Sequence, residues 1–170
     1  TYARGVFQKL YGVDPVTLAS TSPMWSEWAA CRQGKITDFI LKARAIKNKK
    51  NNLILSAVIF PDRPQAEIEK LQKWSLWASN GYLDALTPLI MTSGENLTKN
   101  YISTIKNYSG NRTKIYPGIF QPFSNSSYID MLTQIKTIRE AKADGIIIFD
   151  YAHMNQTYSK ALKARVFNDY

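Results

Sequence analysis

Four short apolar segments recur at nearly even spacing along the chain, and this repeat limits the possible folds more than any other feature. The segments are Leu53–Phe60, Leu83–Ile90, Lys114–Phe120 and Gly145–Asp150, and their first residues lie about 31 residues apart. Each is apolar without strict alternation, which is typical of a strand that is covered on both faces. The spacing leaves room for one helix and two short loops between consecutive strands.

The segments between the strands carry apolar residues at helical spacing. These residues are Ile36, Phe39, Ile40, Ala43 and Ile46, then Ile68, Leu71, Trp74 and Ala78, then Leu97, Tyr101 and Ile105, then Ile129, Leu132, Ile135 and Ile138. Asn80-Gly81 is a suitable end for the second helix, and Ser126 or Ser127 a suitable start for the fourth. A fifth, shorter helix is predicted over about 157–167, and residues 1–34 are predicted to form a short helix followed by a long ordered loop.

This alternation predicts an α/β protein with a parallel sheet and right-handed crossovers. We interpret residues 1–170 as a single partial barrel domain: an irregular entry segment, 1–34, and then, over 35–170, a helix followed by four βα units. Two arrangements fit: the C-terminal half of a TIM-type (β/α)₈ barrel, or a small open doubly wound sheet. No strand is followed by a Gly-rich phosphate turn, which disfavours the nucleotide-binding versions of the open sheet.

The net charge of +9 raises the question of a nucleic-acid partner, but the basic residues are distributed in a way that favours another explanation. The densest cluster is formed by Lys42, Arg44, Lys47, Lys49 and Lys50. It falls on the last turns of a predicted helix and just beyond, where the helix dipole and solvation favour cations. We therefore expect no nucleic-acid partner, while a polyanion-binding basic domain stays open as an alternative.

A membrane-spanning helix, a disulfide and several kinds of metal site are excluded because the sequence lacks the residues that they need. No apolar segment approaches the roughly 20 residues that a membrane-spanning helix needs. Cys31 is the only cysteine and His153 the only histidine, so an intramolecular disulfide, a cysteine-based metal site and a two-histidine metal site are all excluded within this chain. We therefore predict neither a metal nor an organic cofactor.

Candidate functional residues follow from a rule for parallel α/β folds, in which the site lies at the carboxyl ends of the strands. Three acids occupy such positions, and we take them as catalytic candidates: Asp62, Glu95 and Asp150. Glycoside hydrolysis normally needs two carboxyl groups, one of them kept protonated as a general acid. Asp84 enters its strand from the opposite end, and we assign it a structural role.

The same strand ends carry side chains that suit sugar hydroxyls, because amides, hydroxyls and charged groups form hydrogen bonds with them and aromatic faces stack on pyranose rings. The substrate-binding candidates are Arg63, Gln121, Tyr151, His153, Trp25 and Trp28. Asp62 and Arg63 have an alternative role, pairing with each other or capping the next helix. Trp25 and Trp28 lie in the predicted loop, where they form either a packed lid or a sugar platform.

Several motifs resemble the glycosyl-hydrolase-like family 10 proteins. The first is Trp25-x-x-Trp28-x-x-x-Arg32 followed by Ile36-Thr37-x-Phe39-Ile40, and the second is Leu55-Ser56-Ala57-Val58-Ile59-Phe60-Pro61. The third and most specific is Trp74-x-x-Trp77-x-x-x-Gly81-x-Leu83-Asp84-x-x-x-Pro88, and Tyr116-Pro117-Gly118-Ile119 and Gly145-Ile146-Ile147-Ile148-Phe149 follow. The resemblance extends over nearly the whole chain.

The resemblance implies the C-terminal half of a barrel, with the four strands as barrel strands five to eight and an essential carboxylate upstream of Thr1. It implies a polysaccharide substrate, including bacterial cell-wall glycan, and a secreted or cell-envelope location for the full-length protein. The chain departs from the family at Pro88-Leu89-Ile90-Met91, where the family carries Pro-Met-x-Tyr. This loss of a hydroxyl motivates an alternative, a non-catalytic carbohydrate-binding module. A half-barrel has two open sheet edges, so we also expect self-association of these residues by themselves.

Overall fold

The computed structural model describes residues 2–50, 52–110, 112–124 and 126–167. Its helices are α1 (Tyr2–Tyr11), α2 (Met24–Lys47), α3 (Arg63–Ile68), α4 (Trp74–Ser79), α5 (Glu95–Ser109), α6 (Tyr128–Glu140) and α7 (Gln156–Arg165), with 3₁₀ turns at Pro15–Thr17 and Tyr151–His153. Its strands are β1 (Ser56–Ile59), β2 (Ala85–Ile90), β3 (Lys114–Ile115), β4 (Gly118–Ile119) and β5 (Ile147–Ile148). Every predicted strand segment contains at least one of these strands.

The strands form a parallel sheet, as predicted, in the order β1-β2-β4-β5, with β3 also paired to β2. β3 and β4 belong to one predicted strand, which is interrupted at Tyr116-Pro117 because proline has no N–H to donate to the sheet. The order in space follows the order in sequence. A doubly wound sheet instead reverses its strand order at a switch point.

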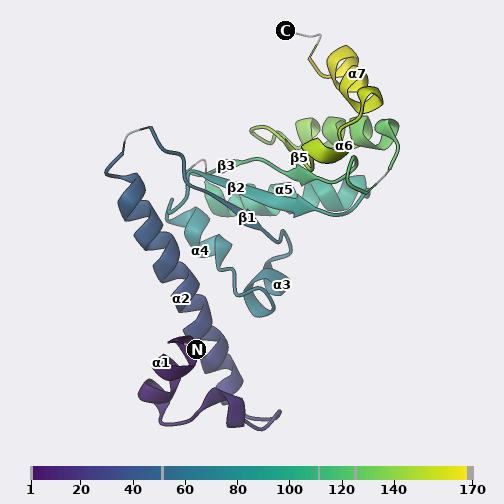
Figure 1. The fold of residues 1–170 in the computed structure, drawn as a ribbon. Coiled ribbons are helices and arrows are strands. Elements are labelled where there is room, and N and C mark those ends of the chain that lie inside the picture. The colour runs from purple at the N-terminus through teal and green to yellow at the C-terminus, as the bar shows by residue number, and fades with distance from the viewer. Residues whose placement is uncertain (1, 51, 111, 125, 168–170) are drawn as a thin grey trace.

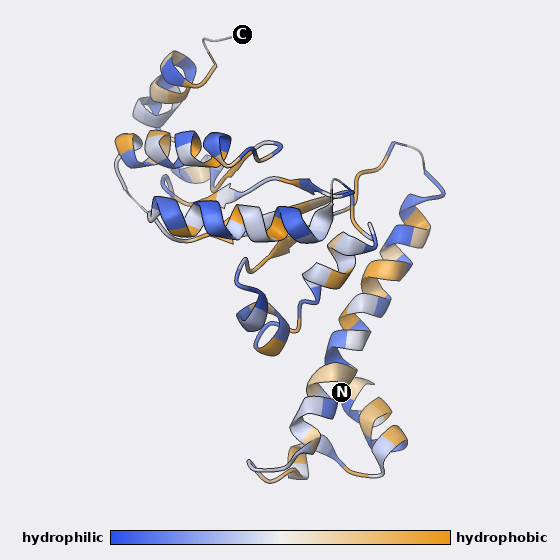
Figure 2. Cartoon of the chain, turned by 180° about the vertical axis from the view of Figure 1, so that it is seen from behind, coloured by the Kyte–Doolittle hydropathy of each residue, from blue (hydrophilic) through white to orange (hydrophobic). Residues whose placement is uncertain are grey.

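The helices α3 to α7, together with the second half of α2, pack against one face of the sheet (Figure 1). One core cluster joins Ile59 and Leu86 of the strands to Trp74 and Trp77 of α4. A second joins Ile119 of β4 to α5, α6 and α7. The helices α4, α5, α6 and α7 also pack in succession, each against the next. Figure 2 shows the strands as mostly apolar, whereas α2 and α5 alternate apolar and polar residues along their length.

The expectation that each strand is buried on both faces is correct for β2 and wrong for β1. All six residues of β2 are buried or nearly so, but Ser56 and Val58 of β1 are exposed, Val58 to 50%. Ile147 of β5 is 38% exposed. Side chains alternate along a strand, so these residues share the face opposite the helices. In the described ranges that face is covered over the middle strands by aromatic rings, and it is open at both edges.

Those aromatic rings form a layer over β4. Phe120 and Phe149 stack with ring centroids 4.8 Å apart and nearly parallel planes. The layer requires Gly118, because a Cβ at that position would lie 2.7 Å from Cε2 of Phe149. The end of β4 and the end of β5 are thus tied together immediately before Gln121 and Asp150.

The N-terminal segment differs from its prediction. α1 is the expected short helix, but α2 begins at Met24 and not near residue 35, so the predicted loop is much shorter. Pro23 precedes the first turn, a position where proline is well tolerated. In Figure 1, α1 and the first half of α2 project beyond the sheet and the other helices.

The second predicted helix is in fact two helices, α3 and α4. α3 ends at Ile68, and a little further along Leu71 has a φ of +59°, which is far from helical geometry. The next residue, Gln72, turns toward β1: its Oε1 accepts a hydrogen bond from the N–H of Phe60 at 2.9 Å, and its Nε2 donates to the carbonyl of Val58 at 3.2 Å. The break therefore satisfies backbone groups along the edge of β1, which no neighbouring strand pairs with in the described residues.

The remaining predictions of helix boundaries agree with the structure. α4 ends at Asn80 and Gly81, where Gly81 has a φ of +59°. Ser127 begins α6 in a reciprocal capping box with Asp130. None of the helices in the described ranges combines the length and apolar character that crossing a bilayer requires.

Candidate functional site

Two adjoining pockets lie at the carboxyl ends of the strands. The first has a volume of about 370 Å³ and lies between the ends of β2 and β4. The second, of about 250 Å³, lies between the ends of β1 and β2. Met91 and Thr92 line both, so the two pockets form one hollow along this edge, which we call the strand-end hollow. Its wall also includes Phe60, Pro61, Asp62, Gln65, Leu89, Ile90, Ser93, Tyr101, Phe120, Gln121, Phe123, Ser124 and Ser126.

Gln121 combines burial with unused hydrogen-bonding capacity. Its residue is 7% exposed, and among the described residues its Oε1 has no hydrogen-bond partner. An unpaired buried acceptor costs about 1–3 kcal/mol. Its backbone carbonyl, in contrast, accepts hydrogen bonds from the N–H of Ser126 at 3.2 Å and from the hydroxyl of Ser124 at 3.3 Å. The turn that follows β4 thus holds the Gln121 backbone in place while leaving the carboxamide unsatisfied.

Asp150 and His153 form a close pair beyond the end of β5. Nδ1 of His153 lies 2.7 Å from Oδ1 of Asp150, and the backbone N–H of His153 donates to the same oxygen at 3.2 Å. The hydrogen bond from the His153 side chain outweighs partial desolvation and lowers the pKa of Asp150. The pair adjoins the strand-end hollow, because the His153 ring lies edge-on to Phe123 with centroids 5.1 Å apart.

Asp62 lines the strand-end hollow but also has a structural partner. Its side chain accepts a hydrogen bond from the N–H of Gln65 at 2.9 Å and so caps α3. This is one of the two alternatives raised by the sequence; the other, a pair with Arg63, is not formed among the described contacts. The guanidinium of Arg63 instead lies 5.3 Å from the centroid of the Tyr108 ring and 4.0 Å from Glu67. Arg63 is therefore engaged with the helices and lines neither pocket.

Four further candidates lie apart from the hollow or extend into solvent. Glu95 is the exposed first residue of α5, and Tyr151 is 94% exposed in the 3₁₀ turn. Trp25 and Trp28 belong to α2 and not to a loop, which corrects the sequence prediction. Trp28 packs edge-on against Phe7 of α1 at 5.2 Å, and Trp25 donates a hydrogen bond from Nε1 to the carbonyl of Ala19 at 2.9 Å. Both rings serve the packing of the N-terminal segment.

Phe123, which follows the third predicted strand segment, was not selected as a site residue from the sequence. It is 57% exposed, it lines the strand-end hollow, and it contacts His153. An aromatic residue three positions after the end of the predicted strand segment Lys114–Phe120 was a usable signal, because aromatic faces stack on pyranose rings. The Asp150-x-x-His153 spacing was a second signal, since it is the spacing of a side-chain cap within one helical turn.

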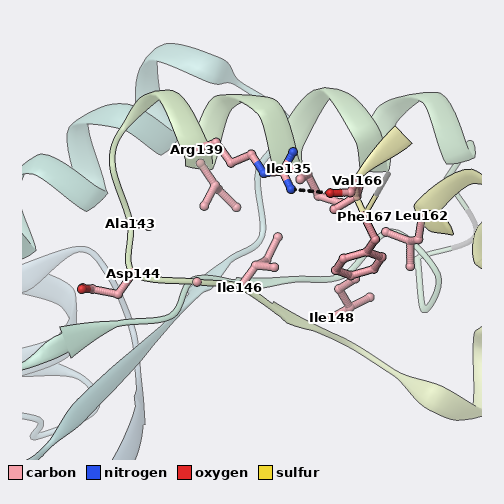
Figure 3. Close-up of a pocket in the computed structure, with 11 residues that line it drawn as sticks. Ile135, Arg139, Ala143, Asp144, Ile146, Ile148, Leu162, Val166 and Phe167 are labelled. Carbon is pink, nitrogen blue, oxygen red and sulfur yellow. Dashed lines mark hydrogen bonds between the residues drawn. The ribbon is translucent and has the colours of Figure 1, made fainter. Parts of the chain in front are cut away.

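A third pocket, of about 310 Å³, lies between α6, β5 and α7 (Figure 3). Its wall is mainly aliphatic, from residues such as Ile135, Ile146 and Leu162, and none of the predicted site residues lines it. Arg139 of α6 crosses it and donates a hydrogen bond from Nη2 to the carbonyl of Val166 at 2.8 Å (Figure 3). Asp144, the other charged side chain on this wall, pairs with Lys114 and with the N–H of Ile115, so both charged groups are engaged, and the pocket lies on the helix side of the sheet.

Part of the basic cluster at the end of α2 has structural partners. Arg44 donates to the carbonyl of Gly81 at 2.6 Å, and Lys47 pairs with Asp84 at 2.9 Å. Both contacts attach α2 to the start of β2. The five cations of this cluster are therefore not all available to a polyanion.

Asp84 has the structural role that its position predicted. Its carboxylate accepts hydrogen bonds from the N–H of Leu55 at 2.7 Å and from Lys47. Burial alone would raise the pKa of Asp84, but these hydrogen bonds and the nearby positive charges of Lys47 and Arg44 outweigh it and lower the pKa.

Comparisons with protein-family models, with curated proteins and with solved structures found no significant match to this chain.

Proposed function

We propose that the chain forms the C-terminal half of a (β/α)₈ barrel and contributes to the glycan-binding cleft of a glycoside hydrolase-like protein. Three features support the barrel: the strand order follows the sequence, the helices that pack on the sheet lie on one face, and the opposite face is open at both sheet edges. In a barrel that opposite face points inward and is filled by side chains from the other strands.

The observation that carries the function is the composition of the strand-end hollow. Phe123 offers an exposed aromatic surface, Gln121 a buried carboxamide whose Oε1 has no partner among the described residues, and Asp62 and Asp150 are carboxylates at the hollow or beside it. Stacking surfaces combined with neutral and charged hydrogen-bonding groups suit a polysaccharide better than a small apolar ligand. The substrate we propose is a bacterial polysaccharide, cell-wall glycan included.

Asp150 suits only one of the two roles that carboxyl groups have in glycoside hydrolysis. A general acid needs a raised pKa, whereas the His153 hydrogen bond lowers the pKa of Asp150. Asp150 therefore fits the ionised carboxylate of a catalytic pair and not its proton donor.

The proposed function is tested by incubating the protein with purified cell-wall glycan strands and analysing the products by mass spectrometry. Shortened oligosaccharides support hydrolysis, and glycan strands that are neither shortened nor bound would refute the proposal.

One observation favours a second candidate, a carbohydrate-binding module without catalysis. Asp62 caps α3 and Asp150 is engaged with His153, so both carboxylates near the hollow already have structural partners. Saturable binding of the same glycan strands with no change in their length would support this candidate over the enzyme. Binding that weakens steeply with added salt would instead support the polyanion-binding alternative.

A further inference from the structure

The geometry of the Asp150–His153 pair fixes which ring nitrogen is free. A carboxylate accepts hydrogen bonds and does not donate them, so at 2.7 Å the proton lies on Nδ1 of His153. In the neutral ring, Nε2 then carries a lone pair and no proton. The imidazole is thereby held as a hydrogen-bond acceptor at a defined position.

The free side of the ring is accessible next to the strand-end hollow. The His153 side chain is 47% exposed, and its edge-on contact with Phe123 limits rotation of the ring. Phe123 is itself 57% exposed and lines the hollow. A sugar ring resting on Phe123 would bring its hydroxyl groups within reach of the imidazole.

We propose that His153 contacts the bound glycan, with Nε2 accepting a hydrogen bond from a sugar hydroxyl, and that Asp150 is the positioning residue that sets this tautomer. The inference rests on the proposed function and refines it, because Asp150 then acts on the glycan through His153. The competing explanation is purely structural: Asp150 also accepts a hydrogen bond from the backbone N–H of His153 and so caps the 3₁₀ turn.

The first measurement separates these explanations in the free protein. His153 is the only histidine, so its two ring nitrogens give an unambiguous ¹⁵N spectrum. We expect the Nδ1–H tautomer in the neutral ring, and a shift toward the Nε2–H tautomer in Asp150→Ala. Asp38→Ala, a change at an exposed acid on α2, is the matched control and should leave the ring spectrum unchanged. An Nε2–H tautomer in the unmodified protein would overturn the inference.

The second measurement is titration with purified cell-wall glycan oligosaccharides. We expect the Nε2 resonance to shift on binding and His153→Ala to weaken binding about tenfold, the effect of losing one hydrogen bond to a ligand. Asp150→Ala should weaken binding less, while Asp38→Ala should bind normally. Normal binding by His153→Ala would overturn this inference and leave the proposed function standing. No binding by the unmodified protein would overturn both.

Discussion

The carboxylate of Asp84 accepts a hydrogen bond from the N–H of Leu55 at 2.7 Å, which ties the residue before β2 to the residue before β1. Asp144 repeats this arrangement with the N–H of Ile115 at 2.9 Å and pairs with Lys114 at 2.8 Å. Both aspartates lie at the amino ends of the strands, the edge that supports stability in parallel α/β folds. The chain thus places one pair of acids for stability and another, Asp62 and Asp150, at the opposite edge.

Replacing Asp84 with Ala should lower the free energy of unfolding by about 1–3 kcal/mol, because the N–H of Leu55 loses a charged acceptor. Asp84→Asn keeps an acceptor oxygen and should cost less. Chemical denaturation of both variants provides the measurement. Asp38→Ala removes an exposed pair with Lys35 and should change stability by less than about 0.5 kcal/mol. A loss in Asp84→Ala no larger than that of Asp38→Ala would contradict the assignment.

Stability should fall in acid, and Asp84 and Asp144 should contribute to the fall. Hydrogen bonds and positive neighbours lower the pKa of each in the folded state despite partial burial. As the pH falls, these aspartates are therefore protonated in the unfolded chain before they are protonated in the folded one. The stabilisation is complete above the pKa of an aspartate in the unfolded chain, near 4, and it is lost as the pH falls through the lower pKa values of the folded state. Denaturation measured from pH 7 to pH 2 should show a smaller decline in the double variant Asp84→Asn/Asp144→Asn. A parallel decline would exclude these groups as its source.

Gly118→Ala should disturb the strand-end hollow, because the added Cβ would lie 2.7 Å from the Phe149 ring and force the Phe120–Phe149 stack to move. We expect reduced stability and altered NMR signals at Phe123 and His153. Gly34→Ala is the matched control: nothing lies within 4 Å of its added Cβ in the middle of α2. Because alanine favours a helix over glycine, this control should gain up to about 1 kcal/mol. Equal effects of the two changes would argue against the close contact at Gly118.

Gln121→Met should weaken glycan binding without destabilising the protein. The substitution removes a buried acceptor that has no partner among the described residues, so stability should stay the same or rise by about 1 kcal/mol. Glycan binding should weaken, because the hollow loses its free carboxamide. Thermal unfolding and the oligosaccharide titration test the two halves of this prediction. A stability loss above about 2 kcal/mol would mean that the carboxamide has a structural partner after all.

Asp150→Asn should reduce glycan cleavage far more than Asp84→Asn, although both changes remove one negative charge from a strand end. The two acids lie at opposite ends of the sheet, and the Asp150–His153 pair adjoins the hollow. Product formation from cell-wall glycan, compared for equally folded samples, decides between them. Equal losses would refute the assignment of function to the carboxyl ends of the strands.

The strands, their parallel arrangement and most helix ends could be predicted from the amino-acid pattern alone. These features depend on local patterns: continuous apolar segments such as Leu83–Ile90, the Asn80-Gly81 stop and the Ser127 cap. Each can be recognised from the few residues that form it, because its energy comes from the same few residues. The structural role of Asp84 was predictable for a related reason, since its position within the strand segment already fixes the sheet edge at which it lies.

Which residues come into contact depends on the folded chain as a whole. Trp28 became a packing residue because α1 folds back onto α2, and the second predicted helix broke between Ile68 and Trp74 because Gln72 satisfies the edge of β1. Phe123 joined the site through its contact with the His153 ring. These outcomes depend on contacts between residues far apart in the sequence, whose energies no local pattern contains.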